Sequence, residues 1–522
     1  MQPHAHRALL HVRSLVSLHP LATLIIVALA LRVALTPLYA HLPNGLLDEG
    51  FWKHWMERIH NDGVLNIFRT SDTDYVGYHW VLWLLAGIYD VIGGPYTQTT
   101  PSLHILVKVP SIAFDVVLIL VVYHATAALV REGRTILEIT SGELRLPLLA
   151  ASVIAFHPAV LYDSAVWAQT DSAITAAMLG AVLLVWKGRP ALAGAGYGLG
   201  LAMKPHPVII GPLLLLALFR NGRWRATMLA AGGVAVVAAL VLGPWVLHGD
   251  AGRIIHVYRT LFNKDYHRLS ELAWNMGWIF DYRGDPRAGT AVFSALPFLT
   301  FRLLGLTLSA IAAAVALAYA GMKPGLRWAL IAAAYQAFAF YALPVGSHER
   351  YLYPFLGLLL PVAMCDRRWL WLYIPVSVTF FLNLVVVAPP VPEWMDRWVY
   401  SEFGVFVAGV NMAFFAAFSA VLVAGIAERT PWRRQPIAAR GRGPARATCP
   451  FGGEDVGIDV VSPEAPSEDN VTYAPPTSCG DGQFKRVWEW SGFPKHRDRD
   501  DIDAWRDKPT STHIVMEREL RA

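Results

Sequence analysis

Residues 226–247 read ATMLAAGGVAVVAALVLGPWVL, an apolar run without a charged side chain. A helix needs about 20 such residues to cross the roughly 30 Å of hydrocarbon in a bilayer. Across the 522 residues of the chain, 55% are apolar and only 16% are charged, whereas about a quarter of the positions in soluble proteins are charged. The chain is therefore predicted to be an all-α integral membrane protein.

Further apolar blocks lie on both sides of this run, and the block at residues 20–40 is the first. That block has a basic flank but no small-residue cleavage signature, so we interpret it as a retained span and not as a signal peptide. Residues 20–427 are then one polytopic domain. Its apolar blocks predict about twelve transmembrane helices, at 20–40, 108–130, 147–162, 172–186, 191–203, 208–219, 226–247, 303–320, 328–343, 351–365, 369–388 and 404–427.

The loops between the predicted helices alternate in basic content. Lys and Arg number 12 in the five loops 131–146, 187–190, 220–225, 321–327 and 366–368, but only three in the four loops 163–171, 204–207, 344–350 and 389–403. Loops rich in Lys and Arg face the cytoplasm. Residues 1–19 and the C-terminal segment are therefore expected in the cytoplasm, and the loops 41–107 and 248–302 on the outer face.

The first outer loop, residues 41–107, contains a predicted amphipathic helix. Asp48 can cap its N-terminus and Gly63 can end it. Four apolar residues share one face at the 3.6-residue period: Trp52, Trp55, Met56 and Ile59. We expect this helix to lie in the membrane interface with its tryptophans toward lipid. The apolar stretch 78–93 is expected to form an interfacial or re-entrant helix on the same side.

Composition excludes several other classes of protein. Three cysteines in a chain of this length argue against a disulfide framework or a thiolate metal site. The net charge of +5 is explained by basic residues beside hydrophobic ends, so no nucleic-acid partner is expected. Only 9 of the 44 basic residues are lysine, which is typical of a GC-rich bacterial source and predicts a bacterial plasma membrane. Residues 428–522 lack a hydrophobic period and are predicted to be a disordered cytoplasmic tail.

Polar and aromatic residues gather in the loops predicted to lie outside, in five short motifs. In chain order they are Asp48 with Trp52 and Trp55; Asp74-Tyr75-Val76-Gly77-Tyr78; His157, Pro158, Tyr162, Trp167, Gln169 and Asp171; Lys204-Pro205-His206; and His348-Glu349-Arg350-Tyr351. Their order and spacing, from about Leu21 to Gly425, resemble the GT-C superfamily of polytopic glycosyltransferases. The second motif lacks the prolines of the family, and the fourth has His206 where the family has glutamine.

The resemblance implies an inverting transferase that uses a lipid-linked sugar. It would move a hexose, with mannose as one candidate, from a polyprenyl-phosphate carrier to a glycolipid, polysaccharide or protein acceptor on the non-cytoplasmic face. In such enzymes the first-loop aspartate is the catalytic carboxylate, a role that the resemblance carries to Asp48. Glu49 is the alternative because the alignment can slip by one residue. A plain helix cap at Asp48 is also an open interpretation.

Transfer from a glycosyl phosphate requires a base for the acceptor hydroxyl and cations for the departing phosphate. The candidates for binding the donor phosphate are Lys204, Arg350, His348 and Arg259. Simple snorkelling to the headgroups is the other interpretation of Lys204. The candidates for binding the sugar or the acceptor are Trp167, Gln169, Asp171, Asp74, Tyr75, His206, Glu349 and Asn275.

No His-based metal site is predicted, because the histidines show no HxxxH or HxH spacing. A divalent cation bound through Asp48 is conceivable but not favoured, since the branch that the chain most resembles generally works without one. The main alternative function is a polytopic transporter or lipid flippase. Transporters usually show repeated halves, and none are visible here. Asp115, inside the second predicted span, is expected to pair with a neighbouring helix or to line a cavity.

Overall fold

The computed structural model describes residues 19–39, 48–71, 73, 75–97, 99–132, 145–263, 268–282, 287–390, 398, 400–428, 446–448, 455–457, 484–488 and 514–518, with the backbone alone at 48, 221, 223, 261–263 and in the four segments after 428. The chain divides into two compact units, Met1–Arg433 and Arg434–Ala522. The described part of the second unit consists of strands. β3 (Arg446–Thr448) pairs with β4 (Asp455–Gly457), and β5 (Phe484–Trp488) pairs with β6 (Ile514–Arg518), both antiparallel. The rest of the predicted tail lies outside the described residues, so its disorder stays a prediction.

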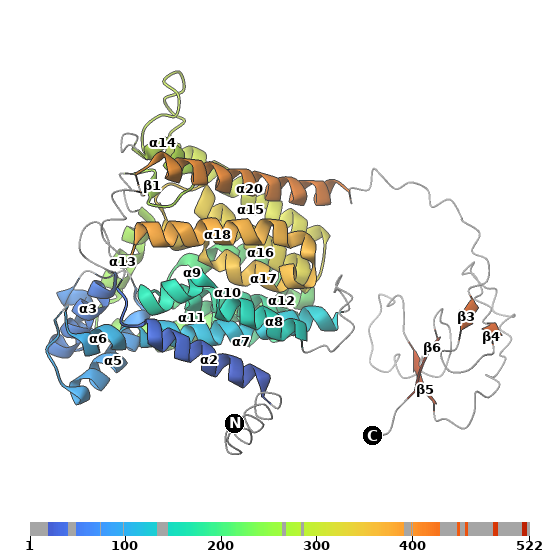
Figure 1. The fold of residues 1–522 in the computed structure, drawn as a ribbon, viewed down its shortest axis with the longest axis horizontal. Coiled ribbons are helices and arrows are strands. Elements are labelled where there is room, and N and C mark those ends of the chain that lie inside the picture. Colours follow the sequence, from blue (N-terminus) through green and yellow to red (C-terminus); the bar gives the residue numbers. More distant parts are fainter. Residues whose placement is uncertain are drawn as a thin grey trace, which may run out of the picture. The chain divides into compact units, whose positions relative to one another are not determined.

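The first unit is a bundle of helices that run along a common direction (Figure 1). The bundle helices are α2 (Pro20–Leu35), α7 (Val109–Arg131), α8 (Arg145–Ala155), α10 (Asp171–Trp186), α11 (Pro190–Met203), α12 (Gly211–Leu247), α15 (Phe301–Met322), α16 (Leu326–Ala342), α17 (Tyr353–Cys365), α18 (Leu370–Val387) and α20 (Glu402–Ala427). The shorter helical elements are α3 (Asp48–Asp62), η1 (Val64–Asn66), α4 (Ile67–Thr70), α5 (Tyr78–Ile92), α6 (Pro101–Leu106), α9 (Pro158–Leu161), η2 (Tyr162–Val166), η3 (His206–Ile210), α13 (Ala251–Asn263), α14 (Met276–Asp281), η4 (Glu349–Leu352) and η5 (Arg367–Trp369). Two short strands, β1 (Ser270–Glu271) and β2 (Ser347–His348), pair in parallel.

Helix length and composition support the predicted membrane class. In the described part of the chain, five helices are long and apolar enough to cross a bilayer, and a sixth counts if Arg145–Ala155 and Pro158–Val166, bent by 50°, form one broken span. The five are Pro101–Arg131, Trp224–Leu247, Phe301–Met322, Arg367–Val387 and Glu402–Ala427. Other apolar helices are shorter than 18 residues, so the number twelve stays a prediction. The all-α membrane architecture itself agrees with the structure.

α12 is helical throughout but cannot be straight. A Cβ at Gly211 would lie 2.8 Å from the hydroxyl of Tyr197, and a Cβ at Gly198 would lie 3.1 Å from Val234. In a straight helix, residues 211 and 234 would be about 35 Å apart, yet both lie against neighbouring residues of α11. The chain therefore reverses between the apolar segments His206–Arg220 and Trp224–Leu247. This position is the basic joint 220–225 of the sequence.

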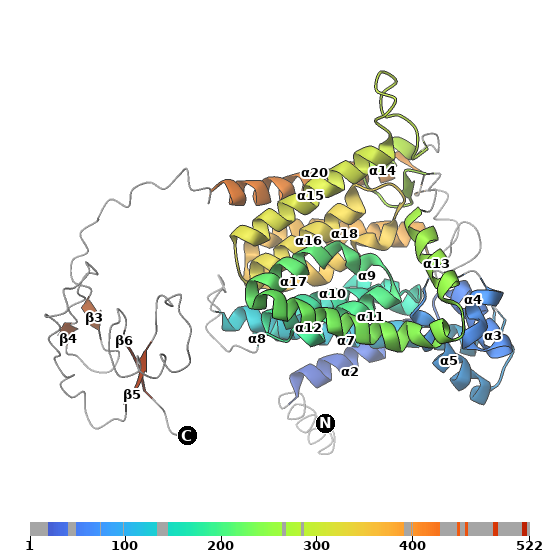
Figure 2. The same cartoon turned by 180° about the vertical axis from the view of Figure 1, so that it is seen from behind.

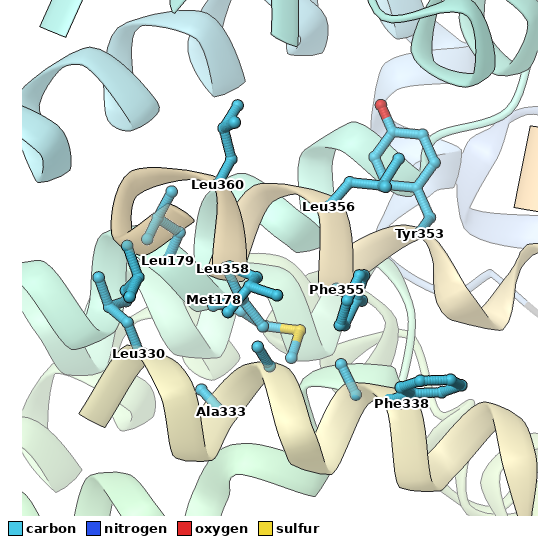
Figure 3. Packing of buried hydrophobic residues seen from close by; sticks show 14 of the residues in the cluster. Met178, Leu179, Leu330, Ala333, Phe338, Tyr353, Phe355, Leu356, Leu358 and Leu360 are labelled. Carbon is cyan, nitrogen blue, oxygen red and sulfur yellow. The ribbon is translucent and has the colours of Figure 1, made fainter. Parts of the chain in front are cut away.

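The centre of the bundle is α17, whose side chains are buried on all sides between α10 and α16 (Figure 3). A helix that is apolar around its whole circumference requires such an interior position. Phe355 and Leu358 of α17 pack with Met178 of α10 and Phe338 of α16 in the same cluster. The packing of these central helices fixes the positions of the connecting loops at each end of the bundle.

The first-loop helix forms as predicted, but its apolar face points the other way. α3 ends immediately before Gly63, whose φ is 80°, and the four predicted apolar residues share one buried face. The expectation that the tryptophans face lipid is wrong, because they pack inward against an aromatic cluster. The ring of Trp52 lies 5.0 Å from that of Tyr75 and 4.8 Å from that of Tyr78, at the start of α5. The outward apolar surface belongs to α5 instead, where Trp83 and Leu84 are exposed.

The two loops predicted to lie outside meet at one end of the bundle. α3, α5 and α6 gather there with α13, β1 and α14, on the left in Figure 1 and on the right in Figure 2. Asp250, before α13, accepts hydrogen bonds from Arg69 of the first loop at 2.9 Å, His248 at 2.8 Å and Arg253 at 2.8 Å. This carboxylate therefore ties the loop 41–107 to the loop 248–302.

The Asp250 junction predicts a pH-dependent stability. Burial favours a higher pKa, but hydrogen bonds from Arg69, His248 and Arg253 outweigh it and lower the pKa of Asp250 to about 2 from the ordinary 3.8. The stabilisation is thus complete above about pH 4 and is lost as the pH falls through about 2. We expect Asp250→Asn to lower the melting temperature at pH 7, and the gap to the wild type to narrow between pH 4 and pH 2. A gap that stays constant over that range would show that the carboxylate charge does not matter.

Candidate active site

Three charged side chains from distant parts of the chain meet at the loop-rich end of the bundle. Lys204 follows the end of α11, and its Nζ lies 2.8 Å from Oδ1 of Asp171. Asp171 is the first residue of α10, where the positive end of the helix dipole favours a carboxylate. Nε of Arg350, in η4, lies 4.0 Å from the other carboxylate oxygen of Asp171. All three side chains are buried, so sequence positions 171, 204 and 350 form one cluster.

Charge pairing keeps the lysine of this cluster protonated. Burial acts to lower the pKa of Lys204, but the charge of Asp171 outweighs it and the net effect is a raised pKa. The amine is therefore a fixed positive charge at neutral pH. Arg350 has a second acidic partner, because its guanidinium donates to Oε1 of Glu349 at 2.9 Å.

Aromatic rings line the same cluster. The guanidinium carbon of Arg350 lies 5.4 Å from the ring centre of Trp167, and Nζ of Lys204 lies 5.8 Å from that of Tyr75. Both distances suit cation–π contacts. Trp167 is buried, whereas Tyr75 is partly exposed. In this arrangement Trp167 supports the guanidinium, and Tyr75 lies at the edge of the cluster.

The backbone around Trp167 is irregular, and this irregularity builds the site. Tyr162–Val166 forms a single π-helical turn, η2, a feature common at functional sites. Ala168 follows with a φ of 65°, and the buried Gln169 donates its backbone N–H to the carbonyl of Asp163 at 2.8 Å. Trp52 of α3 donates its ring N–H to the carbonyl of Ala168 at 3.1 Å. The turn is therefore fixed directly to the first-loop helix.

Gly77 holds the Tyr75 turn against the cluster. Its backbone N–H donates to the carbonyl of Ala202 at 2.8 Å, two residues before Lys204. A Cβ at this position would lie 2.7 Å from the same carbonyl oxygen, a contact that backbone atoms cannot relieve without moving. The close approach to Ala202 thus explains why the second sequence motif has glycine at this position. Asp74 of that motif lies outside the described residues.

His348 and Glu349 enter the site from the β1–β2 pairing. Glu271 of β1 is in register with His348 of β2. The ring of His348 lies 5.2 Å from that of Tyr351, its side chain is 31% exposed, and Glu349 beside it is buried. Together with Tyr75, His348 is therefore one of the accessible side chains at the rim of the cluster.

Asp48 and Glu49 have different surroundings. Asp48 is the first residue of α3, and its side chain lies outside the described residues. Glu49 is buried and its Oε1 accepts from Lys53 at 2.5 Å and from Nδ1 of His104 at 2.6 Å. Burial favours a higher pKa for Glu49, but the hydrogen bonds from His104 and Lys53 prevail and its pKa is lowered. Glu49 is an anchored carboxylate.

His104 connects this anchor to α2 and α7. Nζ of Lys108 lies 3.0 Å from Nε2 of His104 and donates to the carbonyls of Thr36 at 2.8 Å and Leu38 at 2.6 Å. Because an ammonium group can only donate, Nε2 of His104 must accept and its Nδ1–H must donate to Glu49. This network was not predicted from the sequence, although the i, i+4 spacings of 49 with 53 and of 104 with 108 are signals for it.

The remaining candidates lie outside the charge cluster or have structural contacts. Arg259 is on the exposed side of α13. Asn275 caps α14: its Oδ1 accepts from the backbone N–H of Trp278 at 3.2 Å and its Nδ2 donates to the carbonyl of Tyr341 at 2.8 Å. His206 is buried, and its ring lies 4.2 Å from that of Tyr351 in an edge-on contact.

Asp163 is a buried carboxylate that was not predicted from the sequence. Neither of its carboxylate oxygens has a hydrogen-bond partner in the described part of the chain, and it interacts electrostatically with Asp171, Lys204 and Arg350. The only signal in the sequence is its place after Tyr162 in the third motif. Buried unpaired carboxylates are rare, so Asp163 belongs to the candidate site.

Behind the site, Asp115 pairs with a neighbouring helix, as predicted. Nε of Arg32 in α2 lies 2.6 Å from Oδ2 of Asp115, and the hydroxyl of Ser164 donates to the same oxygen at 2.5 Å. Arg32 also donates to the carbonyls of Ala28 and Ala155. These bonds join α2, α7 and η2 within the bundle.

Removing one partner of this ion pair is expected to destabilise the fold. Arg32→Met leaves the Asp115 carboxylate buried without its cation, which costs about 3–5 kcal/mol in comparable cases. Arg32→Met/Asp115→Leu, which removes both charges, is expected to recover most of that loss. Thermal unfolding of the purified protein measures both effects, with the exposed Arg58→Met as the control. Equal melting temperatures for the single variant and the wild type would contradict the proposed importance of the pair.

The described residues contain no group of three or more His, Cys, Asp or Glu side chains arranged to hold a metal ion. Since the side chains of Asp48 and Asp74 lie outside that set, the expected metal independence stays a prediction.

Comparison with known families adds an independent finding. Residues 101–280 match the model of Glycosyltransferase family 87, a family of GT-C type polytopic enzymes. No curated protein matches the chain. The matched region includes Trp167, Asp171 and Lys204, and excludes Asp48 and Arg350. The match supports the resemblance to the GT-C superfamily, and with it a membrane glycosyltransferase.

Proposed function

We propose that this GT-C type membrane glycosyltransferase transfers a hexose from a polyprenyl-phosphate carrier to a glycan, glycolipid or protein acceptor on the non-cytoplasmic face. One observation carries the proposal: Lys204 and Arg350, far apart in the chain, converge on Asp171 at the end of the bundle where α3 begins. A departing phosphate monoester needs cations at that place. We assign the base to the first-loop carboxylate of Asp48, because its helix α3 is fixed to the turn at Ala168 through Trp52.

The proposed reaction is a single displacement with inversion at the sugar. The acceptor hydroxyl oxygen forms a bond to the anomeric carbon while the bond from that carbon to the phosphate oxygen breaks. The electron pair of the broken bond stays on the phosphate, and the hydroxyl proton moves to the carboxylate of Asp48. Lys204 acts on the phosphate as a point charge and Arg350 through a fork of N–H donors.

Both cations of the cluster have acidic partners before the donor binds. Asp171 faces Lys204 and Arg350, and Glu349 binds Arg350. A donor phosphate would therefore compete with Asp171 for the two cations. The acidic partners would keep Lys204 and Arg350 in position until a donor binds. At the accessible rim, His348 is assigned to the donor phosphate and Tyr75 to contacts with sugar hydroxyls, a role that it shares with Gln169.

Sidedness is part of the proposal. The alternation of basic loops places the loop-rich end of the bundle outside and both termini in the cytoplasm of a bacterial cell. The apolar outer face of α5, with Trp83, Leu84 and Ile88 exposed, would lie in the membrane interface. A lipid-borne donor could then reach the cluster without leaving the bilayer.

A transfer assay tests the proposal. Purified full-length protein in lipid nanodiscs is given a synthetic polyprenyl-phosphate mannose, or the glucose analogue, with membrane glycan extract as acceptor. We expect release of polyprenyl phosphate together with incorporation of the sugar, and no reaction with the matching nucleotide sugar. Turnover of the nucleotide sugar alone, or flux of the lipid across proteoliposomes without transfer, would contradict the proposal and favour the transporter interpretation.

A further inference from the structure

An apolar crevice lies at the end of the bundle opposite to the candidate active site, between α10, α12, α15 and α16. α10 starts at Asp171 in the site and ends at Trp186, which lines the crevice. Its 16 residues span about 24 Å. The crevice is therefore a separate feature that the transfer reaction does not use.

The walls of the crevice are aliphatic. They include Val182, Val185, Leu213, Leu214, Ala217 and Ala329. An apolar space of this kind gives water too few hydrogen bonds to be hydrated, and leaving it empty forfeits dispersion contacts along its lining. For a bundle embedded in a bilayer, an acyl chain is the available material that satisfies such walls.

The rim of the crevice is cationic. Arg220 and Lys323 both line it, and no acidic side chain does so among the residues that the structure describes. Arg220 is exposed, and its guanidinium donates to the carbonyls of Ala320, at 3.0 Å, and Gly321 at the end of α15. Nζ of Lys323 lies 4.9 Å from the ring centre of Trp328. Both charges are thus held in place beside the apolar space.

We propose that this crevice binds one anionic phospholipid, with an acyl chain between the four helices and the headgroup phosphate against Arg220 and Lys323. Basic pockets between transmembrane helices suit anionic headgroups because the charge attraction adds to the burial of the chain. A zwitterionic lipid would fill the walls equally well but would gain less at the rim. The bound lipid seals the bundle at the end where α12 reverses.

Native mass spectrometry of the full-length protein tests the proposal with two probe lipids of identical acyl chains, phosphatidylglycerol and phosphatidylcholine. We expect the wild type to retain one phosphatidylglycerol, with at least about tenfold preference over phosphatidylcholine, equivalent to about 1.4 kcal/mol. Arg220→Gln, which removes one of the two rim charges, is expected to weaken the preference. Arg220→Lys keeps the charge and is expected to preserve it. Ala217→Phe, which fills the crevice, is expected to reduce retention of both lipids.

The matched control is Arg225→Gln, because Arg225 is an exposed arginine of the same joint that does not line the crevice. It is expected to leave the preference unchanged. If Arg225→Gln and Arg220→Gln lose the preference for phosphatidylglycerol equally, the effect is diffuse charge attraction and the proposal is overturned. Undiminished lipid retention in Ala217→Phe would also overturn it. Melting temperatures and elution volumes confirm that each variant is folded. If Ala217→Phe is not, Ala329→Phe fills the same space from α16.

Discussion

Replacing Asp48 with asparagine is expected to lower kcat for sugar transfer by about 10³-fold, because a positioned general base contributes about 10² to 10⁴-fold. Asparagine is nearly isosteric with aspartate but cannot accept the acceptor proton at neutral pH. It is also an equally good residue at the start of a helix. The melting temperature and the KM for the donor should therefore stay close to the wild-type values. Steady-state kinetics with the polyprenyl-phosphate sugar measures the effect.

Two further variants separate the base from its neighbours. Glu57→Gln changes a half-exposed carboxylate on the same helix and is expected to retain activity. Glu49→Gln weakens the anchor to Lys53 and His104 and is expected to lower the melting temperature, with activity remaining in the folded fraction. The opposite pattern, a stable but inactive Glu49→Gln beside an active Asp48→Asn, would assign the base to Glu49. Full activity in both would leave Asp48 as a helix cap only.

The sequence predicted the apolar helices well because apolar run length reports directly on membrane burial. It could not show which way an aromatic face points. The period of α3 identified Trp52 and Trp55 as one face correctly, but burial against lipid and burial against protein demand the same residues. Only the position of Tyr75 and Tyr78, brought next to α3 by the turn at Gly77, decides between them.

The candidate site, too, could be predicted from the sequence only in part. Motif order led to Asp171, Lys204 and Arg350, and the structure places their charged groups next to one another. The hydrogen-bond and ion-pair partners could not be predicted from the sequence, because they depend on three-dimensional proximity. Glu49 and His104 are 55 positions apart and meet through packing of α3 on α6. Asp163 was missed since its importance lies in having no hydrogen-bond partner in the described part of the chain, and spacing carries no information about that.

Lys204→Met is expected to lower kcat/KM for the donor by about 100-fold, because a hydrogen bond to a charged group contributes about 1.5–3 kcal/mol. The single variant also removes the close cation from the buried Asp171 and should lower the melting temperature. The double variant Lys204→Met/Asp171→Asn removes both charges, so it is expected to regain stability without regaining activity. Lys187→Met, an exposed lysine at the other end of α10, serves as the control.

The comparison of stability with activity distinguishes a donor-binding lysine from a structural one. If Lys204 serves only to neutralise Asp171, the double variant should recover kcat/KM together with its melting temperature, and that recovery would rule out a phosphate contact. Asp171→Asn alone gives the converse test. It leaves Lys204 and Arg350 without their shared acidic partner, so a phosphate no longer competes with a carboxylate for them. The KM for the donor should then fall even though the fold is weakened, a combination that loss of a purely structural ion pair does not produce.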